Sequence, residues 1–330
     1  MKNLKMFFIL FMLLTIALFS VACGGGNSSG DGATETTFLN ISTSTTGGTF
    51  YAVGGKLADL INKYVENTQA TAEATAGGVE NARLIKNKET SLALMPGDTL
   101  YNAVNGVGEF KNEDKIEINE IAALYETPLQ VVALKRSGIN SIQDLKGKKV
   151  SIGAPGSSTA VRAEIVLNAH GLTLDDIKVD STTSGEASNQ MLDGLIDAAF
   201  FASGAPMAAI MDVAAKEEIN MLSIEPAAMD KIEQEHPDLF EYIIKGGVYP
   251  NVDTDTVCVA NMAVLCCRPD LSEDLVYQIT KTIHEQRDEF ITAHKSLEKS
   301  FNMKTAVTQT KLAPMHPGAL KYYQEAGVMK

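Results

Sequence analysis

Apolar and polar positions repeat along this chain in two rhythms, which predict short strands followed by amphipathic helices. The first pair is the apolar run at 38–41 and the segment 50–65, where Val53, Leu57 and Leu60 share one helical face. Such pairs continue to residue 224, which is typical of parallel sheets covered by helices on both faces. We expect strands at 38–42, 71–75, 91–95, 121–125, 130–134, 149–153, 177–180, 198–202, 220–224 and 256–266, and helices at 50–65, 79–87, 98–105, 158–169, 185–193, 206–216 and 272–294.

Two loops rich in glycine and hydroxyl residues each join a predicted strand to a predicted helix. The first loop is Thr43–Tyr51 and the second is Ala154–Thr159. The first-turn amides of a helix lack internal partners and carry the positive end of its dipole, so they favour an anionic guest. Glycine lets the backbone come close to that guest. We therefore predict that both loops bind an anion, although their hydroxyls can also serve only as helix caps.

The order of elements occurs twice, which predicts two α/β lobes with a cleft between them. A glycine-led helix feeds an apolar strand at 78–95 and again at 185–201, each time after one of the glycine loops. In open α/β sheets a ligand lies outside the carboxyl ends of the strands, where both loops are expected. We assign residues 37–127 plus about 250–330 to lobe I and about 128–249 to lobe II.

Composition narrows the class of ligand. The 330 residues are 45 % hydrophobic and 21 % charged, as in globular proteins, and the net charge is −13. Without a basic stripe, a nucleic-acid partner is not expected. The chain has no tryptophan and 6 % aromatic residues, so an aromatic-lined sugar cleft is not expected either.

The first residues predict export and a lipid anchor. Residues 1–23 combine two lysines, an apolar block at 6–19 and small residues before Cys23, as in a signal peptide. Cysteine after Val-Ala resembles a bacterial lipobox, with Ser20 where leucine is usual. Residues 24–36 then form a flexible tether. We expect a protein lipidated at Cys23 on the outer face of the cytoplasmic membrane; ordinary secretion is the alternative.

Residue patterns that carry catalysis or metal binding are missing from the sequence. None of the five histidines is spaced as a metal motif, and no GxSxG elbow, HExxH motif or P-loop lysine occurs. Ser157 follows a glycine at a helix start, but nothing in the sequence marks a base to activate it. The apolar run around Cys258, Cys266 and Cys267 favours buried thiols over a metal or redox site. We expect no catalytic residue, metal or cofactor.

Candidate ligand contacts come from the two loops and from the ends of strands. Asp98 is placed either to bind a ligand amine or to cap its helix. Arg83 and Arg162 could pair with a carboxylate, but arginines on helices usually face solvent, so we expect hydroxyls and amides rather than a fixed cation. The candidates are Thr45, Thr46, Gly47, Gly48, Thr49, Tyr51, Asp98, Tyr125, Glu126, Ser157, Ser158, Thr159, Phe201, Ser203 and Gly204.

Several motifs in this order resemble the TAXI family, the solute receptors of one class of tripartite ATP-independent periplasmic (TRAP) transporters. The first is Ser44–Gly55 followed by Gly77–Asn81, and the others lie at 145–159, 197–206, 249–250 and 315–323. The resemblance covers nearly the whole chain after Thr37. The sequence departs from the family at Pro96 and at residues 126–128, near the expected cleft.

The resemblance implies a two-lobed periplasmic-binding-protein fold of type II that closes on a small solute. It also implies a membrane permease as partner, driven by an ion gradient, and a ligand such as glutamate or another small organic acid. The expected function is therefore capture of a small carboxylate by an extracytoplasmic lipoprotein that feeds a TRAP permease. A sensor or adhesion lipoprotein of the same fold, and a secreted hydrolase using Ser157, are the alternatives.

Overall fold

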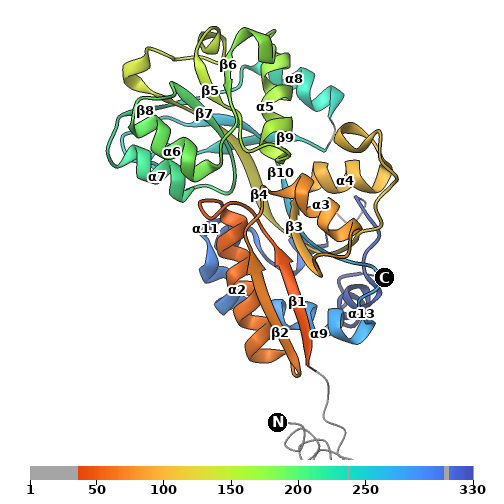
Figure 1. Cartoon of the computed structure of the whole chain (residues 1–330). Helices are drawn as coiled ribbons and strands as arrows, with labels where there is room; N and C mark the ends of the chain where they lie inside the picture. Colours follow the sequence, from red (N-terminus) through yellow and green to blue (C-terminus); the bar gives the residue numbers. More distant parts are fainter. Residues whose placement is uncertain (1–35, 237, 308–311, 330) are drawn as a thin grey trace, which may run out of the picture. The chain divides into compact units, whose positions relative to one another are not determined.

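A mixed sheet of ten strands forms the centre of the fold in the computed structural model, which describes residues 36–236, 238–307 and 312–329. The strand order is β2-β1-β3-β10-β4-β7-β5-β6, with β8 beside β4 and β9 beside β10 (Figure 1). The strands are β1 (Thr37–Ser42), β2 (Thr68–Glu73), β3 (Leu92–Pro96), β4 (Asn119–Leu134), β5 (Lys149–Ser151), β6 (Lys178–Asp180), β7 (Ala198–Ala202), β8 (Ile219–Leu222), β9 (Phe240–Ile244) and β10 (Thr256–Cys267).

Helices connect these strands and cover the sheet. Most of the predicted helices are confirmed, with ends displaced by a few residues. The α-helices are α2 (Thr49–Tyr64), α3 (Gly78–Lys86), α4 (Gly97–Asn105), α5 (Ser158–Ala169), α6 (Ser184–Leu192), α7 (Ala208–Ala214), α8 (Pro226–Glu235), α9 (Glu273–Glu285), α10 (Arg287–Phe290), α11 (Lys295–Ser300), α12 (Met303–Ala306) and α13 (Pro317–Glu325), and the 3-10 helices are η1 (Gly108–Phe110), η2 (Lys135–Ser137), η3 (Gln143–Leu145), η4 (Leu174–Asp176) and η5 (Ile291–Ala293).

Parallel pairing occupies both ends of the sheet and antiparallel pairing its middle. Strand β1 runs parallel to β2 and β3, and β5 runs parallel to β6 and β7, as strand–helix–strand alternation predicts. Strand β10 is antiparallel to β3, β4 and β9, and β4 is antiparallel to β7 and β8. The two parallel sets are therefore joined through β4 and β10. The lobe boundaries assigned from the sequence stay a prediction.

Strand β4 corrects the prediction of two separate strands at 121–125 and 130–134. It is continuous through Pro128, a residue that usually interrupts a strand. The Thr127 hydroxyl donates to Asn261 in the neighbouring strand, which satisfies it in the buried sheet. Pro128 is opposite Ala260 of β10, and the next residue, Leu129, is already paired with β7. Pro128, which has no amide hydrogen to donate, thus lies where β4 changes from pairing with β10 to pairing with β7.

The predicted long helix at 272–294 is also wrong. It ends at Glu285, and Gln286 leaves helical geometry before α10, η5 and α11 follow. The break lets Phe290 become fully buried against Phe301, with ring centroids 5.2 Å apart. Helices α8, α12 and α13 and strand β9 were not predicted.

His316 caps α13 by accepting from the Gly318 amide, and its Nε2 lies 3.1 Å from the Leu271 carbonyl oxygen.

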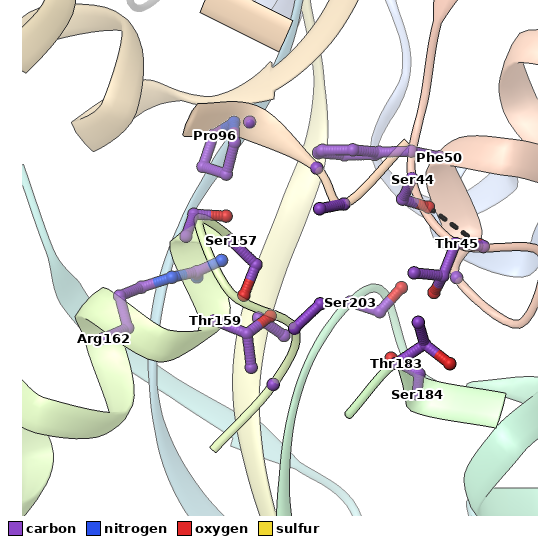
Figure 2. Close-up of a pocket in the computed structure, with 18 residues that line it drawn as sticks. Ser44, Thr45, Phe50, Pro96, Ser157, Thr159, Arg162, Thr183, Ser184 and Ser203 are labelled. Carbon is purple, nitrogen blue, oxygen red and sulfur yellow. Dashed lines mark hydrogen bonds between the residues drawn. The ribbon is translucent and has the colours of Figure 1, made fainter. Parts of the chain in front are cut away.

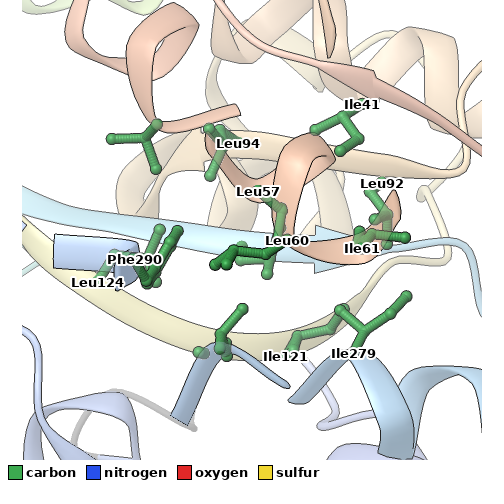
Figure 3. Packing of buried hydrophobic residues seen from close by; sticks show 14 of the residues in the cluster. Ile41, Leu57, Leu60, Ile61, Leu92, Leu94, Ile121, Leu124, Ile279 and Phe290 are labelled. Atoms are coloured by element: carbon green, nitrogen blue, oxygen red, sulfur yellow. The ribbon is translucent and has the colours of Figure 1, made fainter. Parts of the chain in front are cut away.

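Four clusters of buried apolar side chains lie between the helices and the sheet. Two of them use β3, β10 and the first half of β4: one, which also includes β1, packs under α2, α9 and α13, and the other under α3 and α4. Figure 3 shows Leu57, Leu60 and Ile61 of α2 in the first cluster. The other two use the second half of β4 with α5 and α8, or with α6 and α7. Both faces of the sheet are covered, as the sequence predicts.

The predicted leader, the tether and Cys23 lie outside the described residues. Among the helices of the described segments, none combines the length and the apolar character that crossing a membrane requires. Cys258, Cys266 and Cys267 are buried, unpaired thiols in β10, so the prediction of buried cysteines is confirmed.

Candidate ligand-binding site

Five helices begin at one small cavity of about 30 Å³. The residues that precede the first turns of α2, α3, α4, α5 and α6 all line it (Figure 2). Each helix start adds positive potential from its first-turn amides. The cavity is therefore an environment that favours negative charge. These five residues are Gly48, Gly77, Pro96, Ser157 and Thr183.

The five helix starts differ in how they are capped. Ser157 and Thr183 accept hydrogen bonds from the backbone amides of Ala160 and Glu186, so their hydroxyls serve α5 and α6. Such a cap contributes about 1 kcal/mol to stability. The residues preceding α2, α3 and α4 make no side-chain cap. Both uses proposed for the loop hydroxyls, capping and facing the cavity, thus occur together at Ser157.

Arg162 is the cationic residue of the cavity lining, which corrects the expectation that it faces solvent. Its side chain is 1 % exposed and points from α5 toward Ser157 (Figure 2). Its Nη1 donates to the Thr127 carbonyl oxygen at 2.8 Å and to Asn261 Oδ1 at 3.3 Å. Burial lowers the pKa of Arg162, which Asp98 opposes, but a guanidinium remains charged in proteins.

The nitrogen Nε of Arg162 is not satisfied. It lies 3.8 Å from Asp98 Oδ2, which is too long for a hydrogen bond. Among the described residues it has no hydrogen-bond acceptor. A buried polar group without a partner is costly and requires an explanation, such as an ion or water that it binds. Arg162 therefore has hydrogen-bonding capacity that the surrounding protein does not use.

Neighbouring carboxylates are engaged away from the cavity; among the described residues, neither Asp nor Glu lines it. Asp98 accepts from the Thr99 amide at 2.6 Å, and its Oδ2 lies 3.8 Å from Arg162 Nε. Glu80 accepts from the Ala76 amide at 2.6 Å, and Glu126 accepts from the Ser300 hydroxyl. The cavity lining thus carries the positive charge of Arg162, and no carboxylate of the described residues lies beside it on that lining.

Six of the fifteen predicted contact residues line this cavity, and the fold brings them together from both glycine loops and from the end of β7. Whether they touch a ligand stays a prediction. They are Thr45, Gly48, Ser157, Ser158, Thr159 and Ser203.

Part of the first loop faces elsewhere. Thr46, Gly47 and Thr49 line a second cavity of about 380 Å³, beside Pro206 and His294. The Thr49 amide donates to Ser203 Oγ at 2.9 Å, and the Ser203 hydroxyl donates to Thr49 Oγ1 at 2.6 Å. Thr49 thus fastens the loop to the end of β7 rather than facing the first cavity.

The remaining predicted residues lie outside the lining of the first cavity. Tyr51 is 37 % exposed, and Phe201 is buried in the core beneath α6 and α7. Tyr125 is fully buried, which raises its pKa well above the usual value, and its hydroxyl has no partner among the described residues. Gly204 accepts from the Thr49 hydroxyl at 3.4 Å. Asp98 lies beside Arg162, and Glu126 accepts a hydrogen bond from Ser300, as described above.

Several lining residues were missed, and for Arg162 a signal was present. Ser158, Arg162 and Val166 are spaced four apart, so they lie on one helical stripe, and all three are buried. An arginine on a buried stripe next to a glycine loop points to an anion site. Ser44, Phe50 and Ala154 belong to the two predicted loops, and Pro96 was expected near the cleft, although none of the four was a candidate contact. The other lining residues, which were missed, are Ala76, Gly77, Gly78, Gly153, Thr183, Ser184 and Ala202.

Comparison with protein families gives a match over most of the sequence. Residues 41–327 match the model of the NMT1-like family. The chain belongs to the NMT1-like family. Among the described residues of this member, no group of three or more His, Cys, Asp or Glu side chains is placed to hold a metal ion.

Solved structures show the fold. PhnD1 from Prochlorococcus marinus, in complex with methylphosphonate, is 13 % identical with a TM-score of 0.52, covering 79 % of this chain and 91 % of that chain. A protein from Bordetella bronchiseptica is 15 % identical with a TM-score of 0.51, covering 88 % and 82 %. The predicted α/β fold of the type II periplasmic binding proteins is thereby confirmed, with a mixed sheet flanked by helices.

Proposed function

We propose that this NMT1-like protein is an extracytoplasmic solute-binding lipoprotein that captures a small carboxylate and delivers it to a TRAP-type permease. The observation that carries the proposal is Arg162, a buried guanidinium on a cavity that five helix starts also face and no carboxylate lines. A guanidinium matches the planar carboxylate group, and such charge-assisted hydrogen bonds are about twice as strong as neutral ones.

Both the lipid anchor and the TRAP permease rest on the sequence. The export signal with Cys23 supports the anchor, and the motifs at 44–55, 77–81 and 145–159 support a TRAP receptor. The solved neighbour that holds methylphosphonate supports capture of a small anion by this fold. Loss of uptake after deletion of the gene would support transport. Unchanged uptake would favour a sensor or adhesion lipoprotein.

The contacts of Ser157 favour binding over hydrolysis. Its Oγ accepts from the Ala160 amide at 3.2 Å, and no histidine stands among the residues of the cavity lining. A serine nucleophile needs a base within hydrogen-bond reach. We expect no labelling of Ser157 by a fluorophosphonate; labelling at this residue would support the hydrolase alternative.

Calorimetry on the mature chain tests the proposal. The protein is unfolded and refolded to remove bound solute, then titrated with carboxylates, methylphosphonate, sugars and nucleobases. We expect heats of binding for carboxylates and their loss in Arg162→Gln. Binding of sugars or nucleobases alone would refute a carboxylate receptor, and preference for methylphosphonate would keep the anion site but change its ligand.

A further inference from the structure

The cavity has a positive side but no negative counterpart, and this asymmetry restricts its ligand. In the part of the chain that the structure describes, Arg162 and eight hydroxyl side chains line it, but no Asp or Glu does. Helix starts present N–H groups, whereas their carbonyl oxygens point along the helix toward its other end. The five helix starts therefore supply hydrogen-bond donors and few backbone acceptors.

We infer, resting on the proposed function, that the ligand is a small acid without an ammonium group, such as a 2-oxo or 2-hydroxy acid, and that amino acids are excluded. A buried ammonium needs a paired charge, because leaving a charge unpaired in a desolvated site is costly. The nearby carboxylates do not line the cavity, and each already accepts a hydrogen bond elsewhere: Asp98 from the Thr99 amide, Glu80 from the Ala76 amide, and Glu126 from the Ser300 hydroxyl.

Two other groups could receive an ammonium, and neither replaces a carboxylate. Phe50 is the aromatic residue of the lining, and a cation over an aromatic face gains roughly 0.5–2 kcal/mol. Hydroxyl oxygens accept a hydrogen bond but bring no negative charge. The same helix starts that attract a carboxylate repel an ammonium.

A neutral oxygen on the ligand, by contrast, fits the hydroxyls. A 2-oxo group accepts from serine and threonine hydroxyls, and a 2-hydroxy group both donates and accepts. Side chains that can meet it come from both glycine loops, from the start of α6 and from the end of β7. They are Ser44, Thr45, Ser157, Ser158, Thr159, Thr183, Ser184 and Ser203.

Matched pairs of ligands test this inference on the refolded mature chain by calorimetry. The pairs are pyruvate with L-alanine, 2-oxoglutarate with L-glutamate, and glycolate with glycine, so the members of each pair differ at one substituent. In each pair that binds, we expect the acid without the amine to bind at least about tenfold more tightly, which corresponds to about 1.4 kcal/mol. An amino acid that binds as tightly as its partner, or more tightly, overturns the inference and leaves the carboxylate receptor standing. Absence of binding by every acid and amino acid overturns both.

A variant adds the missing charge. Ser184 is the first residue of α6 and lines the cavity, and an acidic side chain is compatible with the first turn of a helix. Ser184→Asp should shift the ratio of amino-acid to oxo-acid affinity toward the amino acid by about tenfold or more, while the uncharged Ser184→Asn leaves the ratio nearer the original. An unchanged ratio in a folded Ser184→Asp protein argues against charge as the cause of selectivity. If this variant does not fold, titration of the wild-type protein with the matched ligand pairs decides the inference.

Discussion

The guanidinium of Arg162 is hydrogen-bonded to the carbonyl oxygen of Thr127 at 2.8 Å, which fastens helix α5 to the middle of strand β4. The same side chain lines the cavity and faces Asp98 of α4. A single residue thus connects the candidate ligand site with the strand that both halves of the sheet share. Its substitution should affect binding and stability by separable routes.

Arg162→Gln should lower carboxylate affinity by roughly 10- to 150-fold, the loss of a charge-assisted hydrogen bond worth about 1.5–3 kcal/mol. It should also destabilise the fold by about 3–5 kcal/mol, because Asp98 loses its buried counter-charge. Calorimetry and urea unfolding measure the two effects.

The double variant Asp98→Asn/Arg162→Gln separates them. Without the carboxylate, most of the lost stability should return, whereas the affinity should stay low. If a folded Arg162→Gln protein binds its carboxylate as well as the wild type, Arg162 is a structural residue only.

Gly48→Ala should weaken binding through steric conflict at the loop. A Cβ added at Gly48 would lie 2.4 Å from Ser44 Oγ, and both residues line the cavity. Overpacking of this kind costs roughly 1–3 kcal/mol. The Ser44 hydroxyl is the main obstacle, so Gly48→Ala should cost less affinity in a Ser44→Ala background than in the wild type. Titration of the two single variants and the double variant measures this difference.

Gly55→Ala is the matched control in the same helix. A Cβ there meets nothing within 4 Å, so this change should leave affinity unaltered and stabilise α2 by about 0.5–1 kcal/mol. Equal losses of affinity in the two alanine variants would mean that helix rigidity, rather than crowding at Gly48, controls binding.

The strand and helix pattern was predictable where it is local. Helix α5 follows from its own apolar spacing and its Ser157 cap, and the glycine loops mark the cavity because helix starts bind anions irrespective of tertiary detail. Arg162 was assigned to the surface because what holds it lies far along the chain, at Thr127, 35 positions away, and at Asn261, 99 positions away. The continuity of β4 was hidden for the same reason, since its partner at Thr127 comes from β10.

The hydroxyls of Thr49 and Ser203 should be energetically coupled. Ser203 accepts from the Thr49 amide and donates to its hydroxyl, at buried positions 154 residues apart. A double-mutant cycle with Thr49→Val and Ser203→Ala should give a coupling energy of about 0.5–1.5 kcal/mol in urea unfolding. Thr49→Ser keeps the hydroxyl and should retain most of the stability. Additive losses in the cycle would show that the two hydroxyls act independently.

Glu120 should make the protein less stable as the pH rises from about 5 to 8. Burial raises its pKa to about 8, above the ordinary value of 4.5, while backbone amides of residues 312 and 313 oppose this. The folded state therefore holds a proton that the unfolded state has released, and the stabilising contribution, complete below pH 4.5, is lost as pH rises through 8. Urea unfolding at several pH values measures this slope.

Glu120→Gln is the control for that slope. It keeps an oxygen for the amide of Ala313, which now donates to Glu120 Oε1 at 2.8 Å, but has no proton to lose. At pH 8 the variant should be more stable than the wild type by at least about 1 kcal/mol, the equivalent of less than one pKa unit. Identical slopes in the two proteins would mean that Glu120 is ionised at neutral pH.

The position of β10 between β3 and β4 also governs the order in which the chain can assemble. Strand β3 is buried along its whole length, yet its second neighbour is a strand that ends at Cys267, some 170 residues later. The chain is synthesised from its N-terminus, so β1, β2 and β3 can pair early. One edge of β3 stays open until β10 has been synthesised. An open apolar edge invites pairing with other chains. This half of the molecule can thus begin to form first but is completed last, and in that interval the edge of β3 is open to pairing with other chains.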